Sequence, residues 1–276
     1  MTVYNYRSFW NHVKKGVTHF TINQIHKQGQ SEWKFTSPKN PSKEEGLLKL
    51  RSGKVTPTYT FIEYLKAGME ISLICCIDFT GSNGDPRNPN SLHYMKPFVR
   101  GTQDLNDYQK AILSVGEILL NYDADKLVQT YGFGAKPRGS QQTSHFFPCS
   151  GDYTNCSGVG VNGVFELYKL ALNNVTLSGP TFFAPMLKEI RLFTEDNFKR
   201  SPDNYTILLI LTDGVIHDMQ RSIDEVVRAS CLPLSVIIVG IGDADFDLME
   251  QLDSDDKVTR QLKCEDSCQY QLSKIF

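Results

Sequence analysis

The sequence predicts an α/β fold in which a doubly wound, mostly parallel sheet is flanked by helices and preceded by a short β-rich segment. Two observations support this prediction: several apolar runs are rich in β-branched residues, and segments of helical period alternate with them. Runs that are apolar on both faces are typical of parallel strands covered by helices. Strands that alternate with helices indicate a doubly wound sheet, whose ligand sites lie at the carboxyl ends of the strands.

The first part of the chain has a different pattern. Thr18–Ile25, Trp33–Thr36 and Gly46–Leu50 have strand character, and a loop rich in Pro, Lys and Glu (37–46) joins the last two, which predicts a β-hairpin. Residues 59–68 then have the amphipathic pattern of a short helix that leads into the main sheet. We therefore predict two domains, at residues 1–56 and 57–276.

The main domain is predicted to contain four strands and four helices. The strands are expected at Ile71–Ile77, Lys126–Phe133, Tyr205–Leu211 and Ser235–Gly240. The helices are expected at Asn106–Tyr122, Val161–Asn173, Pro185–Phe198 and Met219–Ser230. In the first helix the apolar residues fall on one stripe, and Pro233 ends the last helix ahead of a strand.

Composition and charge exclude some classes of protein. The net charge of −2 gives no case for nucleic-acid binding, but residues 1–66 hold eleven Lys and Arg against four Glu. This basic piece could contact anionic phospholipid or an acidic partner, or it could be a solvated positive face. No apolar run reaches the ~20 residues of a membrane span, and the start has no signal-peptide pattern, so we expect a cytoplasmic protein, peripheral at the plasma membrane at most.

Seven cysteines, two of them adjacent in the apolar run at Cys75 and Cys76, favour buried reduced thiols. Neither a disulfide framework nor a structural zinc site is expected from their spacing.

The main chemical signal lies where predicted strands end. Residues 78–82 (DFTGS) place Asp78, Thr80 and Ser82 on the loop that leaves the first strand, and Asp213 follows a later strand directly. Thr181 lies in a loop just ahead of a helix. Helix N-capping could explain each feature alone. Three such loops at one edge of one sheet favour a cation site, and hard oxygen ligands of this kind suit Mg²⁺ or Mn²⁺.

Enzymatic motifs do not appear. The glycine-rich segment at 132–139 lacks the order of a phosphate-binding loop, and residues 78–82 lack the second aspartate of an aspartyl-phosphate hydrolase. There is no Gly-x-Ser-x-Gly elbow, and the histidines are scattered. We interpret the chain as a binding module and not as an enzyme.

Several long motifs resemble the copine family, in the family's order and spacing. They are IDFTGSNGDP (77–86), SLHY (91–94), YGFGAKP (131–137), LSGPTFFAP (177–185), LLILTDGVIHDM (208–219), ASCLPLSVIIVGIGDADF (229–246) and MEQLD (249–253). The resemblance covers roughly residues 57–253 and implies a von Willebrand factor A-type domain, similar to integrin I domains.

The resemblance also implies a function. The metal-ion-dependent adhesion site of such domains falls on Asp78, Thr80, Ser82, Thr181 and Asp213, with hydroxyls on the metal and aspartates acting largely through water. An open coordination position would accept an Asp or Glu of a partner protein. The chain is thus expected to be a metal-dependent protein-interaction module. The alternative is a calcium-dependent phospholipid-binding protein at the plasma membrane, because copines carry two C2 domains ahead of the A-type domain.

The chain departs from the family pattern in three places. Residues 1–56 could hold only a remnant of the second C2 domain, and no aspartate precedes Asp78, so no C2 calcium site is expected, although Ca²⁺ could occupy the adhesion site. The family pattern is lost after Asp253. Phe182 stands where family members often have asparagine.

Overall fold

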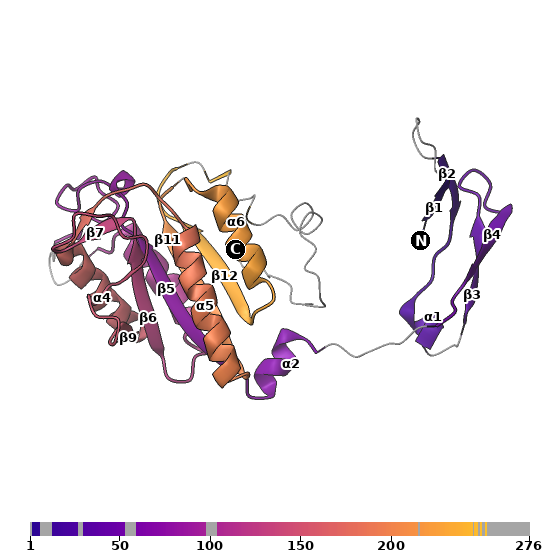
Figure 1. The fold of residues 1–276 in the computed structure, drawn as a ribbon, viewed down its shortest axis with the longest axis horizontal. Helices are drawn as coiled ribbons and strands as arrows, with labels where there is room; N and C mark the ends of the chain where they lie inside the picture. Colours follow the sequence, from indigo (N-terminus) through magenta and orange to yellow (C-terminus); the bar gives the residue numbers. More distant parts are fainter. Residues whose placement is uncertain are drawn as a thin grey trace. The chain divides into compact units, whose positions relative to one another are not determined.

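The computed structural model describes residues 2–5, 13–26, 30–52, 59–97, 104–214, 216–244, 246, 247, 249 and 252. The chain forms two compact units, Met1–Phe61 and Ile62–Phe276 (Figure 1). The predicted boundary between residues 56 and 57 lies outside the described residues.

The N-terminal unit is a four-stranded antiparallel sheet in the order β1-β2-β3-β4. Its strands are β1 (Thr2–Asn5), β2 (Val13–Val17), β3 (Glu32–Thr36) and β4 (Glu44–Lys49). The predicted hairpin is confirmed, with Trp33 opposite Leu48. The side chains of Trp33 and Phe35 are buried on one face of β3.

The strand predicted at Thr18–Ile25 is wrong. β2 ends at Val17, and Ile22–His26 form the short helix α1. The backbone N–H of Thr21 donates to Gln24 Oε1 at 2.8 Å, and the N–H of Gln24 donates to Thr21 Oγ1 at 3.2 Å. This reciprocal cap is a helix-start signal, and it outweighs the β-branched residues of the segment.

The second unit contains a six-stranded sheet in the order β12-β11-β5-β6-β8, with β9 also paired to β6. The four predicted strands are confirmed as β5 (Glu70–Asp78), β6 (Leu127–Phe133), β11 (Asn204–Thr212) and β12 (Leu234–Gly240). They are mutually parallel, whereas β8 (Phe147–Pro148) and β9 (Ser157–Val159) run antiparallel to β6. A separate antiparallel pair joins β7 (Ala135–Pro137) to β10 (Val175–Leu177).

Helices cover both faces of this sheet, as predicted. They are α3 (Asp107–Leu119), α4 (Gly160–Asn174), α5 (Ala184–Arg200) and α6 (Met219–Ala229), and the short helix α2 (Phe61–Lys66) precedes β5. Alternate residues of β5 enter two cores: Cys75 and Ile77 join the core with α3 and α4, while Ile74 and Cys76 join the core with α5. Burial on both faces explains the unbroken apolar run of β5.

The order of the strands positions the site. From β5 the chain passes through α3 to β6 on one side, and it later returns through α5 to β11 on the other side of β5. Ligand sites of doubly wound sheets lie where successive connections diverge in this way, at the carboxyl ends of the strands. Here those ends belong to β5 and β11.

The cysteines of the core lead to a testable prediction. Cys75, Cys76 and Cys149 are buried, and burial raises the pKa of the Cys75 thiol to about 12. The thiolate is the reactive form, so these three residues should resist alkylation by iodoacetamide at pH 8 in the native protein. Peptide mapping before and after denaturation would check this. Rapid native labelling of Cys75 or Cys76 would contradict the packing.

Candidate metal site

Asp78, the last residue of β5, anchors the candidate site. Its side chain is fully buried. The backbone N–H and the hydroxyl of Thr80 both donate to Asp78 Oδ1, at 2.8 and 2.6 Å. The hydroxyl of Thr212, from the neighbouring strand β11, donates to Oδ2 at 2.6 Å. Both carboxylate oxygens of Asp78 therefore accept hydrogen bonds, one from the loop that follows β5 and the other from the end of β11.

The hydroxyls of Thr80 and Ser82 lie close together beside two carboxylates. Thr80 Oγ1 donates to Asp78 Oδ1 at 2.6 Å, and Ser82 Oγ donates to Asp213 Oδ1 at 3.0 Å. The two hydroxyl oxygens lie 3.0 Å apart, within hydrogen-bond distance, and either could donate to the other. The site thus gathers hard oxygen atoms of the kind that Mg²⁺ binds.

The spacing of that pair is compatible with a bound cation. In an octahedral Mg²⁺ site with bonds of about 2.1 Å, neighbouring oxygens lie about 3.0 Å apart. Thr80 Oγ1 and Ser82 Oγ are 3.0 Å apart, which is also an ordinary hydrogen-bond distance, so the spacing does not select one cation over another.

Thr181 is buried, and its backbone is bonded to His217. Its carbonyl accepts from the N–H of His217 at 3.0 Å, and its own N–H donates to His217 Nδ1 at 3.3 Å. In the same loop, the Ser178 carbonyl accepts from the N–H of Gly81. The structure thus links Asp78, Thr80, Ser82 and Asp213 in one hydrogen-bonded chain. The loop that carries Thr181 is joined to this region at Gly81, while Thr181 itself is bonded to His217. Metal ligation by the five residues stays a prediction.

The charges at the site favour a cation. Burial raises the pKa of Asp78 to about 7, against the hydrogen bonds from Thr212 and Thr80, and the nearby charge of Asp213 raises it further. Burial also raises the pKa of Asp213. Within the described ranges, neither carboxylate forms an ion pair with a Lys, Arg or His side chain. Buried charges are costly unless paired, and a divalent cation would pair both.

The described residues contain no group of three or more His, Cys, Asp or Glu placed to hold a metal. The candidate donors here are two carboxylates and two hydroxyls, hard oxygen atoms of the kind that Mg²⁺ binds together with water.

Several residues that the sequence did not reveal stabilise the loop that follows β5 through hydrogen bonds. Asn83 Nδ2 donates to the Thr80 carbonyl at 3.2 Å, and the Tyr108 hydroxyl donates to Asn83 Oδ1 at 2.7 Å. His93 Nε2 donates to the Asp78 carbonyl at 2.9 Å, and its Nδ1 accepts from the Tyr168 hydroxyl at 2.7 Å. Burial lowers the pKa of His93 to about 3, so the ring is neutral. Only the motif at 91–94 signalled His93 in the sequence, and its partners lie on α3 and α4.

Gly134 directly follows β6 and lies against Thr80. Its φ is +78°, and a Cβ there would collide with Thr80 Cγ2. We expect Gly134→Ala to lower the free energy of unfolding by about 2–4 kcal/mol and to weaken Mg²⁺ binding by displacing Thr80. The matched control is Gly214→Ala, beside Asp213, where an added Cβ meets nothing within 4 Å. Calorimetric titration of both variants would check this, and equal Mg²⁺ affinity in the two would contradict it.

Comparison with solved structures gives only a weak likeness. Manganese-loaded Plasmodium vivax TRAP protein aligns with 13% identity over 75% of this chain and 68% of its own, at a TM-score of 0.41. Proximal thread matrix protein 1 from the mussel byssus, with a zinc-occupied MIDAS motif, aligns with 18% identity over 67% of this chain and 41% of its own, also at 0.41. We draw nothing from likenesses of this level.

Sequence comparison is decisive for the family. The copine family model matches residues 91–271. Protein BONZAI 2 of Arabidopsis thaliana is 46% identical over 200 residues, which cover 72% of this chain and 33% of that protein. Protein BONZAI 1 of the same plant is 42% identical over 237 residues, which cover 85% of this chain and 40% of that protein. The chain therefore spans well under half the length of these relatives, and it belongs to the copine family.

Proposed function

We propose that this copine domain is a metal-dependent protein-interaction module. In this proposal Asp78, Thr80, Ser82, Thr181 and Asp213 hold Mg²⁺ or Mn²⁺, and a carboxylate of a partner protein completes the site. The observation that carries it is the pair of hydroxyl oxygens, 3.0 Å apart, each bonded to a buried carboxylate that forms no ion pair with a Lys, Arg or His of the described residues.

The five candidate ligands differ in how far they are exposed to solvent. Asp78, Thr80, Thr181 and Asp213 are buried, whereas Ser82 is exposed, so a partner would approach from the Ser82 side. A bound cation supplies positive charge with an open position for an incoming carboxylate oxygen. The protein residues fix the oxygens around that position and keep the carboxylates in place. We infer recognition and not catalysis, because in this proposal the hydroxyls and carboxylates serve as ligands and supports of the cation rather than as nucleophiles.

Asp78→Asn tests the proposal directly. The amide keeps the shape of the side chain and can still bond to Thr80 and Thr212, but it removes the charge. We expect Mg²⁺ and Mn²⁺ affinity to fall by at least about 100-fold in isothermal titration, because a ligand set with few charges depends on each one. Unchanged affinity in a folded Asp78→Asn variant would rule the site out.

Asp78→Asn should also change the thermal stability of the metal-free protein in EDTA. The folded-state pKa of Asp78 is about 7, above the ordinary 3.8, so protonation of Asp78 stabilises the fold increasingly as the pH falls from about 7 toward 3.8. Above pH 7 the buried charge destabilises the metal-free protein. Asp78→Asn should therefore raise its Tm by roughly 2–8 °C at pH 8, with a smaller gain at pH 5. A lower Tm for the variant at pH 8 would contradict the account.

A second candidate function is binding to anionic phospholipid through the N-terminal sheet, at the plasma membrane. It is supported by the excess of eleven Lys and Arg over four Glu in residues 1–66. Lys14 and Lys15 of β2 are exposed there. No described helix has the length and apolar character needed to cross a membrane. We accordingly propose a cytoplasmic protein whose contact with membranes, where it occurs, is peripheral.

Liposome sedimentation would test this candidate. Residues 1–77 contain no aspartate, so binding through the N-terminal sheet should require phosphatidylserine but not Ca²⁺. We expect Lys14→Glu/Lys15→Glu to weaken it about three- to tenfold, and EGTA to leave it unchanged. Loss of binding in EGTA would instead support the calcium-dependent mode expected of the family.

A further inference from the structure

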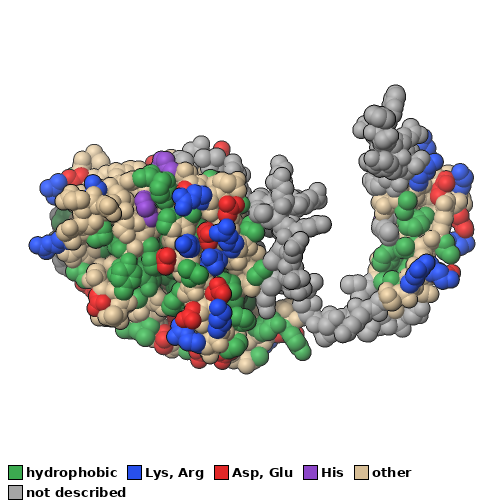
Figure 2. Space-filling model, viewed as in Figure 1, with side chains coloured by type: hydrophobic (Ala, Val, Ile, Leu, Met, Phe, Trp, Pro, Cys, Tyr) green, Lys and Arg blue, Asp and Glu red, His purple; other side chains and the backbone are tan. Residues whose placement is uncertain are grey.

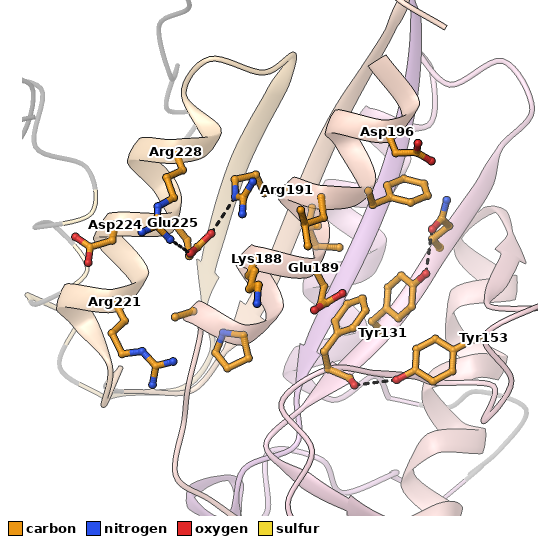
Figure 3. Close-up of a pocket in the computed structure, with 17 residues that line it drawn as sticks. Tyr131, Tyr153, Lys188, Glu189, Arg191, Asp196, Arg221, Asp224, Glu225 and Arg228 are labelled. Atoms are coloured by element: carbon orange, nitrogen blue, oxygen red, sulfur yellow. Dashed lines mark hydrogen bonds and ion pairs between the residues drawn. The ribbon is translucent and has the colours of Figure 1, made fainter. Parts of the chain in front are cut away.

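A hollow of about 1070 Å³ lies along α5, and four basic and four acidic side chains line it. On the face formed by α5 and α6, Lys and Arg side chains lie among Asp and Glu (Figure 2). Arg191 is paired with both Glu195 and Glu225, and Arg228 is also paired with Glu225 (Figure 3). Because the two kinds of charge are balanced, the hollow favours no class of charged ligand. The polar groups that connect to the candidate metal site lie on the other face of the sheet.

Three side chains on that other face form a hydrogen-bonded relay that ends at Asp78. Asn106 Nδ2 donates to the Tyr168 hydroxyl at 3.2 Å, and this hydroxyl is 2.7 Å from His93 Nδ1. His93 Nε2 in turn is 2.9 Å from the Asp78 carbonyl. Tyr168 and His93 are fully buried, and Asn106 is 5% exposed. We call Asn106, Tyr168 and His93 the relay.

The two ends of the relay fix the direction of its protons. Asn106 Oδ1 accepts from the backbone N–H of Gln109 in the cap of α3, so Nδ2 faces Tyr168 and can only donate. The Asp78 carbonyl can only accept, so Nε2 of the neutral His93 ring carries the proton and Nδ1 accepts from Tyr168. The Tyr168 hydroxyl therefore holds the His93 ring with its Nε2–H toward Asp78.

The peptide group between Asp78 and Phe79 is held from both sides. Its carbonyl accepts from His93, and its N–H donates to the Phe133 carbonyl of β6 at 2.8 Å. The His93 ring also stacks on Phe79 and Tyr108, with centroids 5.3 and 4.3 Å away. This peptide group begins the loop that carries the candidate hydroxyl ligands, so its orientation determines where they lie.

A relay of this kind could serve the packing of the core or the geometry of the metal site. A hydrogen bond that serves packing alone contributes to stability and leaves the metal affinity of the folded protein unchanged. Mg²⁺, in contrast, requires nearly ideal octahedral geometry, and residues that orient metal ligands commonly change affinity by about 10–100-fold. The two roles therefore differ in their effect on metal affinity.

We propose that Tyr168 is a positioning residue of the metal site and that it acts through His93. Its hydroxyl keeps the His93 Nε2–H on the Asp78 carbonyl, and the relay thereby fixes the loop at residues 78–82 for a divalent cation. The inference rests on the proposed function, and it adds residues that lie outside the ligand set.

The test is isothermal titration of the full chain with Mg²⁺. Tyr168→Phe removes only the hydroxyl, and we expect Mg²⁺ affinity to fall about tenfold. The matched control is Tyr131→Phe, because the Tyr131 hydroxyl bonds to Gln129 Oε1 at 3.1 Å in the hollow along α5 (Figure 3), in the other core. This control should bind Mg²⁺ like the unmodified chain. Unchanged affinity in Tyr168→Phe, or an equal loss in the two variants, would overturn the proposal.

The His93 ring supplies a spectroscopic readout that core packing alone would not change. In ¹⁵N NMR of the histidine side chains, His93 should show a protonated Nε2 and a hydrogen-bonded, unprotonated Nδ1. The signals missing from His93→Gln identify this ring. In Tyr168→Phe the Nδ1 resonance should move toward that of an acceptor without a donor, and in Tyr131→Phe it should stay in place. A Nδ1 resonance that does not move in Tyr168→Phe would contradict the relay.

Two variants of similar size test the last bond of the relay, and they decide the question if Tyr168→Phe does not fold. The side chain introduced by His93→Gln can donate to the Asp78 carbonyl, whereas that introduced by His93→Met cannot. His93→Gln should therefore bind Mg²⁺ at least about fivefold more tightly than His93→Met. Equal affinities would overturn this inference and leave the proposed function standing. An unmodified chain that binds neither Mg²⁺ nor Mn²⁺ would overturn both.

Discussion

The burial of one carboxylate, Asp78, at the end of the central strand is the constraint on which the rest of the site depends. An ionised carboxylate without a cationic neighbour is unfavourable in a protein interior, and burial therefore raises the pKa of Asp78. The fold nevertheless fixes both of its oxygens, with Thr80 on one and Thr212 on the other. Such an arrangement makes physical sense when a cation is part of the folded state.

The surroundings of the site keep its loops in place and leave one side open. His93 holds the backbone of Asp78, and Asn83 holds the backbone of Thr80, so α3 and α4 support the loop from beneath. The opposite face of the sheet is covered by α5 and α6.

The sequence predicts the strands well and places the candidate ligands at or near their carboxyl ends, because both are local signals. β5 and β11 are apolar on both faces, and Asp78 and Asp213 follow the apolar residues at their carboxyl ends. Elements such as β8 are too short to show a hydrophobic period in the sequence. The cap formed by Thr21 and Gln24 starts helix α1 where a strand was expected. The support from Tyr108 and Tyr168, and the sharing of Glu225 by two arginines, depend on contacts between elements that no single segment encodes.

The most direct measurement is anomalous diffraction from crystals of the protein grown with Mn²⁺, recorded near the manganese edge. The account predicts one strong anomalous peak within about 2.3 Å of both Thr80 Oγ1 and Ser82 Oγ, with Asp78 and Asp213 in the surrounding shell. A well-ordered site with no peak, or a peak bound elsewhere on the chain, would contradict it.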